Sequence, residues 1–80
     1  MRRLESPLFD ELKSHTADPL LLEALELAEE AILSGADPTR ADCISIDDIV
    51  YDRATLGVMV AYEIDGDGVR FLSYADLWNR

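Results

Sequence analysis

Basic residues are scarce in this sequence. Its 80 residues include 7 Lys and Arg against 17 Asp and Glu, which gives a formal net charge of −10. Nucleic acids and anionic membranes repel a small protein of this charge, whereas basic surfaces attract it. We therefore expect neither direct nucleic-acid binding nor a membrane, and we expect the partner to be a basic protein surface.

Cysteine, histidine and long apolar runs are also nearly absent. Cys43 and His15 are single representatives of their types, which excludes an internal disulfide and a structural zinc site within one chain. The longest apolar-rich stretch, residues 19–33, contains four glutamates and is too short to span a bilayer. The N-terminus lacks the apolar run of a signal peptide. These absences predict a cytoplasmic protein with no cofactor and no metal.

The chain nevertheless contains enough apolar residues to fold. Hydrophobic residues make up 49% of it and are spread along its whole length, unlike the composition of disordered acidic segments. Its length predicts one domain covering residues 1–80. A domain of this size buries about 60 to 65% of the surface that its unfolded chain exposes, so its stability margin is small.

Two helices are predicted in the N-terminal half. Ser6 and Pro7 form a helix start, because Ser caps free N–H groups and Pro fits the first helical position, and they predict a short helix at about Pro7–Ser14. Asp18 repeats the start signal and Gly35 gives a stop signal, which predict a longer helix at Pro19–Ser34.

The longer helix is predicted to be amphipathic. At about 100° per residue, one broad arc is apolar and is expected to face the core. It contains Leu20, Leu21, Ala24, Leu25, Leu27, Ala28, Ala31 and Ile32. The opposite arc contains Glu23, Glu26, Glu29 and Glu30, and no Lys or Arg lies between Lys13 and Arg40 to pair with them along the helix.

Extended structure is predicted after the connecting loop at residues 35–42. A first strand is expected within residues 43–52, although Asp47-Asp48 interrupts the pattern and a helical turn competes with it. Alternation predicts a clear strand at residues 56–64, a tight turn at residues 65–68 and a returning strand at residues 69–74. The predicted fold is α+β, with two N-terminal helices packed on one face of a small antiparallel sheet of two or three strands.

None of the candidate catalytic or metal motifs is complete. The segment at residues 63–68 matches the opening of a calcium loop, but the twelfth position is Tyr74 where a bidentate Glu is required, which favours a hairpin turn. Ser14 and His15 lie at a helix end without the frame of a catalytic triad, and Cys43 has the setting of a buried core thiol. We therefore expect no enzymatic activity.

In size, in acidity and in its lack of catalytic motifs, the chain resembles the small phage-encoded inhibitors of bacterial defence, the anti-CRISPR and antirestriction proteins. The resemblance implies a non-enzymatic inhibitor in a bacterial host cell that occupies a basic nucleic-acid-binding site on a larger effector complex, with DNA mimicry as one mode of action. The expected contact residues are the acidic side chains Glu23, Glu26, Glu30, Asp47, Asp48 and Asp52, with Tyr51 and Trp78 as aromatic anchors.

Other functional classes also fit the sequence. An antitoxin or immunity protein that neutralises a basic toxin would use the same electrostatics. The segment Gly68–Tyr74 after two helices also resembles the C-terminal part of small ribosome-dependent or gyrase-directed toxins, but that family begins with a strand and has a basic face, and the sequence predicts neither here. A homodimer is a further expectation, formed through an edge strand with Leu22, Leu33 and Trp78.

Overall fold

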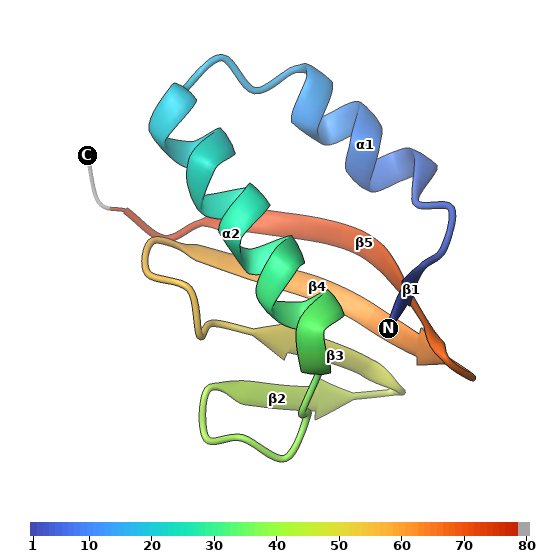
Figure 1. Ribbon diagram of the computed structural model, residues 1–80. Coiled ribbons are helices and arrows are strands. Elements are labelled where there is room, and N and C mark those ends of the chain that lie inside the picture. The colour runs from blue at the N-terminus through green and yellow to red at the C-terminus, as the bar shows by residue number, and fades with distance from the viewer. Residues whose placement is uncertain (79–80) are drawn as a thin grey trace.

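The helices and strands form two layers. A computed structural model of the chain describes residues 1–78. Along the chain, the elements are β1 (Arg2–Arg3), α1 (Pro7–Ser14), α2 (Pro19–Gly35), β2 (Cys43–Ile46), β3 (Ile49–Asp52), β4 (Val58–Asp65) and β5 (Gly68–Asp76). The strands form one sheet in the order β1-β5-β4-β3-β2, and both helices lie on the same side of it (Figure 1). The predicted α+β class is confirmed.

The sheet is larger than predicted and is mixed. It has five strands where two or three were expected, and β1 runs parallel to β5 with Arg2 opposite Gly68 and Arg3 opposite Val69. The amides of Arg2 and Leu4 donate to the carbonyls of Asp67 and Val69. Two consecutive arginines have no strand periodicity, so this strand arises from its pairing. The prediction that no strand precedes the helices is therefore wrong.

Residues 43–52 form a hairpin of two strands. Ile46 pairs with Ile49, which leaves Asp47 and Asp48 as a two-residue turn. Both residues have positive φ, 51° and 66°, as a type I′ turn requires. The acidic pair that interrupts the strand pattern in the sequence is the turn itself, and the alternative of a helical turn is wrong. The predicted hairpin at residues 65–68 is confirmed, with Asp65 opposite Gly68.

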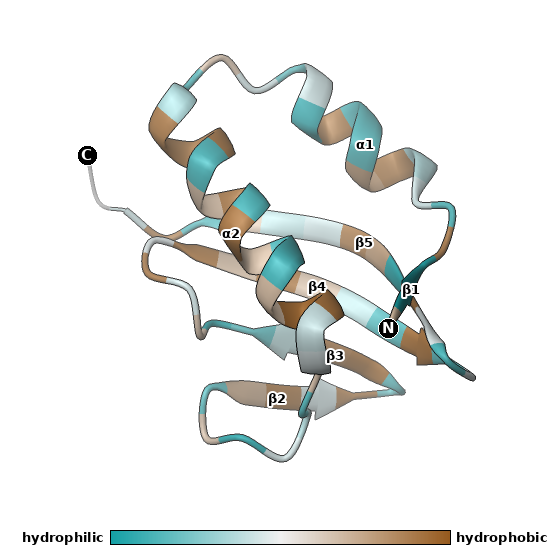
Figure 2. Ribbon diagram, viewed as in Figure 1, coloured by the Kyte–Doolittle hydropathy of each residue, from teal (hydrophilic) through white to brown (hydrophobic). Residues whose placement is uncertain are grey.

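The core lies between the helices and the inner face of the sheet (Figure 2). Phe9 of α1 stacks on Phe71 of β5 with ring centroids 5.3 Å apart, and the ring of Tyr74 meets Phe9 edge-on at 5.8 Å. The remaining buried core residues are Leu21, Ala24, Leu25, Ala28, Ile32, Val50, Val58, Val60, Tyr62 and Val69. Leu33 is half-buried and packs against this cluster.

The two helices begin in different ways. The Asp18 carboxylate accepts hydrogen bonds from the amides of Leu20 and Leu21, so it caps α2 as predicted. Ser6 makes no such cap. It is buried, and its hydroxyl donates to the Leu4 carbonyl and accepts from the Phe71 amide, which ties the start of α1 to β5. Within residues 1–78, neither helix combines the length and apolar character needed to cross a bilayer.

Candidate functional site

Three glutamates form an exposed line along α2. Glu23, Glu26 and Glu30, here called the glutamate strip, are all exposed and occupy positions i, i+3 and i+7. At 1.5 Å rise per residue, successive members are about 4.5 and 6 Å apart along the helix axis. None of the three forms an ion pair with any residue of the described range 1–78. Their charge is therefore directed to solvent.

Glu29 does not belong to this strip. It is 8% exposed, and its carboxylate binds Arg3 at 3.1 Å and Lys13 at 2.7 Å. The Arg3 guanidinium also pairs with Asp10 at 2.7 Å, and that hydrogen bond is the main cause that raises the pKa of Arg3. The expectation that Glu29 lies on the solvated arc is wrong, because β1 and α1 bring two cations against it. Those cations are thereby engaged away from the strip.

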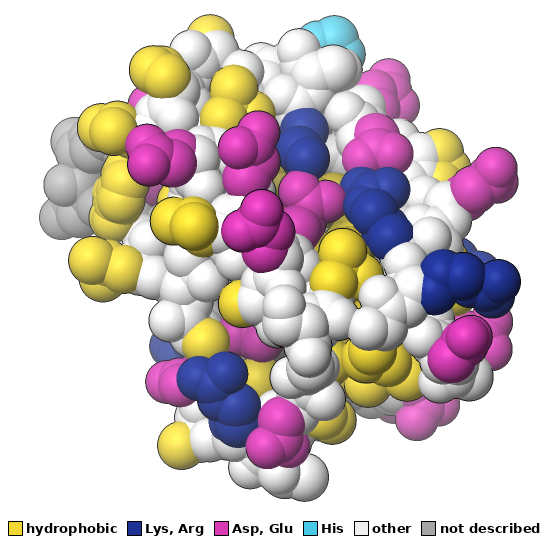
Figure 3. Space-filling model, viewed as in Figure 1, with side chains coloured by type: hydrophobic (Ala, Val, Ile, Leu, Met, Phe, Trp, Pro, Cys, Tyr) yellow, Lys and Arg dark blue, Asp and Glu magenta, His cyan; other side chains and the backbone are white. Residues whose placement is uncertain are grey.

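An apolar groove lies beside the glutamate strip. Leu20 and Leu27 were expected in the core, yet they are 59% and 55% exposed. Together with Glu23, Ala24, Thr55, Leu56 and Trp78 they line a hollow of about 240 Å³, here called the leucine groove. In Figure 3, hydrophobic side chains gather over the start of α2 and the β3–β4 loop, with acidic side chains beside them. The site thus combines apolar surface with a carboxylate border.

Gly57 positions the indole of Trp78 at this groove. Gly57 has φ of 92°, and a Cβ atom built on it would lie 2.2 Å from the Trp78 ring. The residue must therefore be glycine both for its backbone conformation and for the close approach of the ring. The half-buried Trp78, predicted as an aromatic anchor, is held against the β3–β4 loop by this contact.

The structure separates the three aspartates that were predicted to join the strip. Asp47 and Asp48 form the turn between β2 and β3, whereas Asp52 ends β3 opposite Cys43. Four residues of strand separate Asp48 from Asp52, or about 13 Å. Asp47 and Asp48 are exposed at the end of the sheet where the β4–β5 turn also lies (Figure 1). The expected acidic cluster is therefore divided between two ends of one hairpin.

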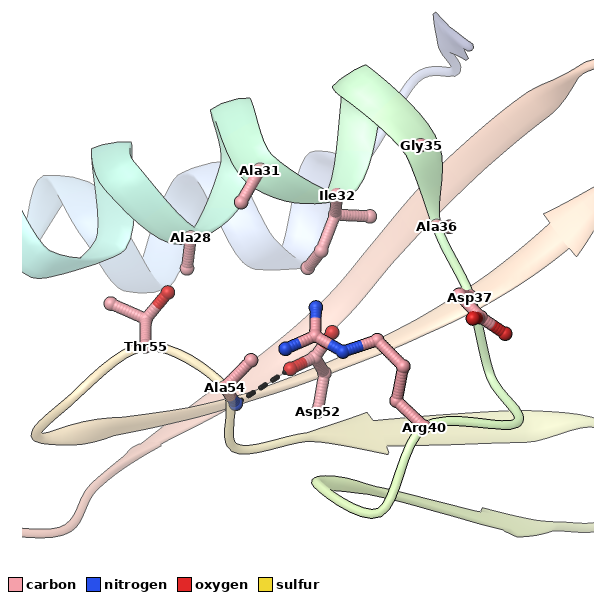
Figure 4. Close-up of a pocket in the computed structure, with 10 residues that line it drawn as sticks. All are labelled: Ala28, Ala31, Ile32, Gly35, Ala36, Asp37, Arg40, Asp52, Ala54 and Thr55. Atoms are coloured by element: carbon pink, nitrogen blue, oxygen red, sulfur yellow. Dashed lines mark hydrogen bonds between the residues drawn. The ribbon is translucent and has the colours of Figure 1, made fainter.

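Asp52 lies in a small hollow beneath the second half of α2. Its carboxylate accepts a 2.8 Å hydrogen bond from the Ala54 amide, and the Arg40 side chain extends beside it (Figure 4). The hollow has a volume of about 20 Å³, which is room for roughly one water molecule. A half-buried carboxylate in this setting is less accessible to a protein partner than the glutamate strip.

The turn end of the sheet is acidic in a way that the sequence did not reveal. The turns at Asp47-Asp48 and at Asp65–Asp67 lie at the same end, because β2 and β4 run in the same direction. Asp67 is 3.7 Å from Arg2 and Asp65 is 4.0 Å from Arg70, which are long contacts between exposed groups. Topology thus brings together two acidic pairs that are distant in sequence.

The other predicted or considered residues are dispersed. Tyr51 is half-buried on the face of the sheet that lacks helices, opposite Ile44 and Ala61. His15 is exposed at the C-terminus of α1. Cys43 packs against the core, and burial is the largest cause that raises the pKa of its thiol to about 11. Among residues 1–78, no three His, Cys, Asp or Glu side chains are grouped so that they could hold a metal ion.

Comparisons of the chain with protein-family models, with curated proteins and with solved structures found no match.

Proposed function

We propose that this protein is a non-enzymatic binding protein that occupies a basic, nucleic-acid-binding surface on a larger protein. The observation that carries the proposal is the glutamate strip, where Glu23, Glu26 and Glu30 stand exposed without ion pairs in the described chain while adjacent Glu29 is bound by two cations. Like charges at these spacings destabilise a helix by about 0.2 to 0.5 kcal/mol per pair. A basic partner would relieve that repulsion on binding.

The leucine groove gives the same surface an apolar component. Carboxylates at the rim of an interface mainly steer association and set its salt dependence, whereas buried apolar anchors slow dissociation. Leu56 is 85% exposed, and Leu20 and Leu27 flank it across the groove. A basic surface that also carries an apolar side chain would fit both features. This combination distinguishes the proposed mode from purely electrostatic attraction.

The target class follows from the resemblance to phage-encoded inhibitors of bacterial defence. A basic groove that holds nucleic acid is the kind of surface that displayed carboxylates can block, either by mimicry or by steric exclusion. An antitoxin or immunity protein would need the same charge distribution, with a basic toxin as the target. The location of the gene, within a phage or prophage locus or beside a toxin gene, distinguishes the two.

The test is capture of the partner from host extract on the immobilised chain at low salt, followed by elution with duplex DNA. We expect a basic protein that DNA displaces. Reversal of the strip in Glu23→Lys, Glu26→Lys and Glu30→Lys should weaken its binding at least about 100-fold, since each tenfold loss corresponds to only about 1.4 kcal/mol.

A matched variant controls for net charge. Glu5→Lys, Glu11→Lys and Asp67→Lys alter exposed residues outside the strip. Each reversal adds two charges, so both triple variants have a formal net charge of −4 in place of −10. The control variant should retain most of the affinity. Equal loss in both variants would show that net charge alone matters, and full retention by the strip variant would refute the proposal.

A further inference from the structure

The face of the sheet that points away from the helices is apolar and open. Side chains that lie opposite one another in register share a face. The Ile44–Tyr51–Ala61 row and the Ile46–Ile49 row belong to the face opposite the core, because the neighbouring positions Val50 and Tyr62 point into the core. Ile44 and Ile46 are 51% and 56% exposed. We call this surface the outer face.

Strand β2 shows that the apolar character of the outer face is not a by-product of core packing. Its larger apolar residues, Ile44 and Ile46, point outward, while Cys43 and Ser45 occupy the positions that point toward the helices. A half-exposed antiparallel strand normally has the reverse pattern, with apolar residues toward the core and polar residues toward solvent. The reversal leaves the apolar side chains of this strand exposed on the outer face.

The outer face carries little net charge. Its charged strand positions lie on β4 and β5, where Arg70 is 2.6 Å from Glu63 and 4.0 Å from Asp65. The other outward positions on the described strands β2–β5 are uncharged and include Tyr51, Met59 and Ala75. Nearly all of the net charge of −10 therefore resides elsewhere, on α2, on the turns and on the loops.

We propose that the outer face is the contact surface between two copies of this chain, related by a two-fold axis. Two molecules that each carry −10 repel one another least where they meet through a surface of little net charge. An isologous contact places the outer face of one copy against that of the other, which buries Ile44 and Ile46 of both. This proposal is independent of the partner proposed for the glutamate strip.

The size of the outer face limits the area that a dimer can bury. Four strands spaced about 4.8 Å apart, rising about 3.3 Å per residue, give it roughly 19 by 20 Å. A two-fold pairing then buries a total area on the order of 1,000 Å², the lower end for specific interfaces. An interface of this size is typical of a weak or transient dimer. It leaves both glutamate strips exposed on the helical layers, where they can bind two basic sites at once.

This arrangement replaces the dimer expected from the sequence. That prediction used Leu22, Leu33 and Trp78 as surplus apolar surface. Leu22 and Leu33 are half-buried, Leu33 packs against the core, and the Trp78 ring lies against Gly57. The surface that remains for self-association is the outer face.

Light scattering after size exclusion, at rising protein concentration, tests the dimer directly. The mass of the full chain should increase from 8.9 kDa toward twice that value, and added salt should promote the increase because it screens like charges. Partner binding through the glutamate strip should weaken with salt. A monomer at all concentrations and salt conditions overturns the proposal.

Two lysine variants locate the contact. Ile46→Lys places a charge twice in a two-fold interface and should raise the dissociation constant at least about 100-fold. Leu56→Lys introduces the same residue at the leucine groove and should leave the dimer unchanged. Circular dichroism of both variants checks folding, and Ile44→Lys serves as the replacement if Ile46→Lys does not fold. Dissociation by Leu56→Lys but not by either outer-face variant would overturn the assignment.

Discussion

The helical side of the molecule and the outer face of the sheet differ in how they combine charge with apolar surface. On the helical side, the leucine groove is lined in part by Glu23, the first member of a glutamate strip that has no ion pairs in residues 1–78, so apolar contact there favours a partner of opposite charge. On the outer face, the exposed Ile44 and Ile46 lie on the edge strand β2, whereas the charged side chains Glu63 and Arg70 pair with each other on β4 and β5, so apolar contact with a copy of the same chain would meet little repulsion there. A net charge describes neither surface, because its distribution decides which partner each surface accepts.

The contrast recurs within α2 at a smaller scale. Glu29 and Glu30 are adjacent, yet one is buried against Arg3 and Lys13 and the other is exposed without an ion pair in the described chain. The first joins three segments of the fold, since Arg3 comes from β1 and Lys13 from α1. The second adds to a surface charge that makes no contact within the fold. The same residue type therefore has a structural role at one position and is left exposed to solvent at the next.

Truncation of one side chain on the inner face and one on the outer face of the sheet should give the largest difference in the free energy of unfolding. Phe71→Ala removes a side chain that is 1% exposed and stacked on Phe9, and should lower the free energy of unfolding by about 3 to 5 kcal/mol. Ile44→Ala on the outer face should lower it by less than about 1 kcal/mol in dilute solution, because that side chain is half exposed.

Urea denaturation of both variants at two protein concentrations measures the difference. If the proposed dimer forms, the loss of stability caused by Ile44→Ala should increase at the higher concentration, because dimerisation adds to stability. If Ile44→Ala lowers the free energy of unfolding of the dilute monomer as much as Phe71→Ala does, the assignment of Ile44 to an open face is wrong.

Substitution of the adjacent residues Glu29 and Glu30 should give the next largest difference in the free energy of unfolding. Glu29→Gln removes the negative charge that binds Arg3 and Lys13 and should cost about 1 to 3 kcal/mol, less than for a fully buried pair because both cations are partly exposed. Glu30→Gln should change stability by less than about 0.5 kcal/mol. Thermal unfolding at low salt compares the two, and equal effects would refute the distinction between them.

Local signals in the sequence predicted the helices well. The Asp18-Pro19 start and the Gly35 stop gave α2 to within one residue, because capping and φ restriction act on neighbouring residues. The hairpin at residues 65–68 was predictable for the same reason. Strand β1 was not predictable, since Arg2 and Arg3 become a strand through hydrogen bonds with β5, more than sixty residues away.

The candidate site was only partly predictable. Helical periodicity identified the glutamate strip, but it also placed Glu29 on the strip and Leu20 and Leu27 in the core. A helical projection gives the angle of each residue and says nothing of what lies against it. The cations near Glu29 come from other elements, and both leucines line the open groove instead of packing in the core. Tertiary placement determined all three outcomes.

Two tyrosines, one on each face of the sheet, allow the faces to be compared by removing a single hydroxyl group from each. Tyr62 is 0% exposed in the core, and its hydroxyl has no hydrogen-bond partner in the described chain, whereas Tyr51 is half-buried on the outer face. Tyr62→Phe removes this unsatisfied polar group and should stabilise the protein by about 1 kcal/mol at neutral pH. Tyr51→Phe should have a smaller effect.

The pH dependence of stability also tests whether the Tyr62 hydroxyl is buried, and it does not rely on a small difference at neutral pH. Burial is the largest cause that raises the pKa of Tyr62 from its ordinary 10.0 to about 12. Between these values the unfolded chain loses the phenolic proton while the native protein keeps it, so stability falls as pH rises from about 10 to about 12. Tyr62→Phe should remove this loss. The raised pKa of the Cys43 thiol produces a separate decline in stability from pH 9 to about 11, and Cys43→Ala removes that decline. If Tyr62→Phe leaves the decline above pH 10 unchanged in a Cys43→Ala background, the Tyr62 hydroxyl is solvated, and the inner face is more open than its packing indicates.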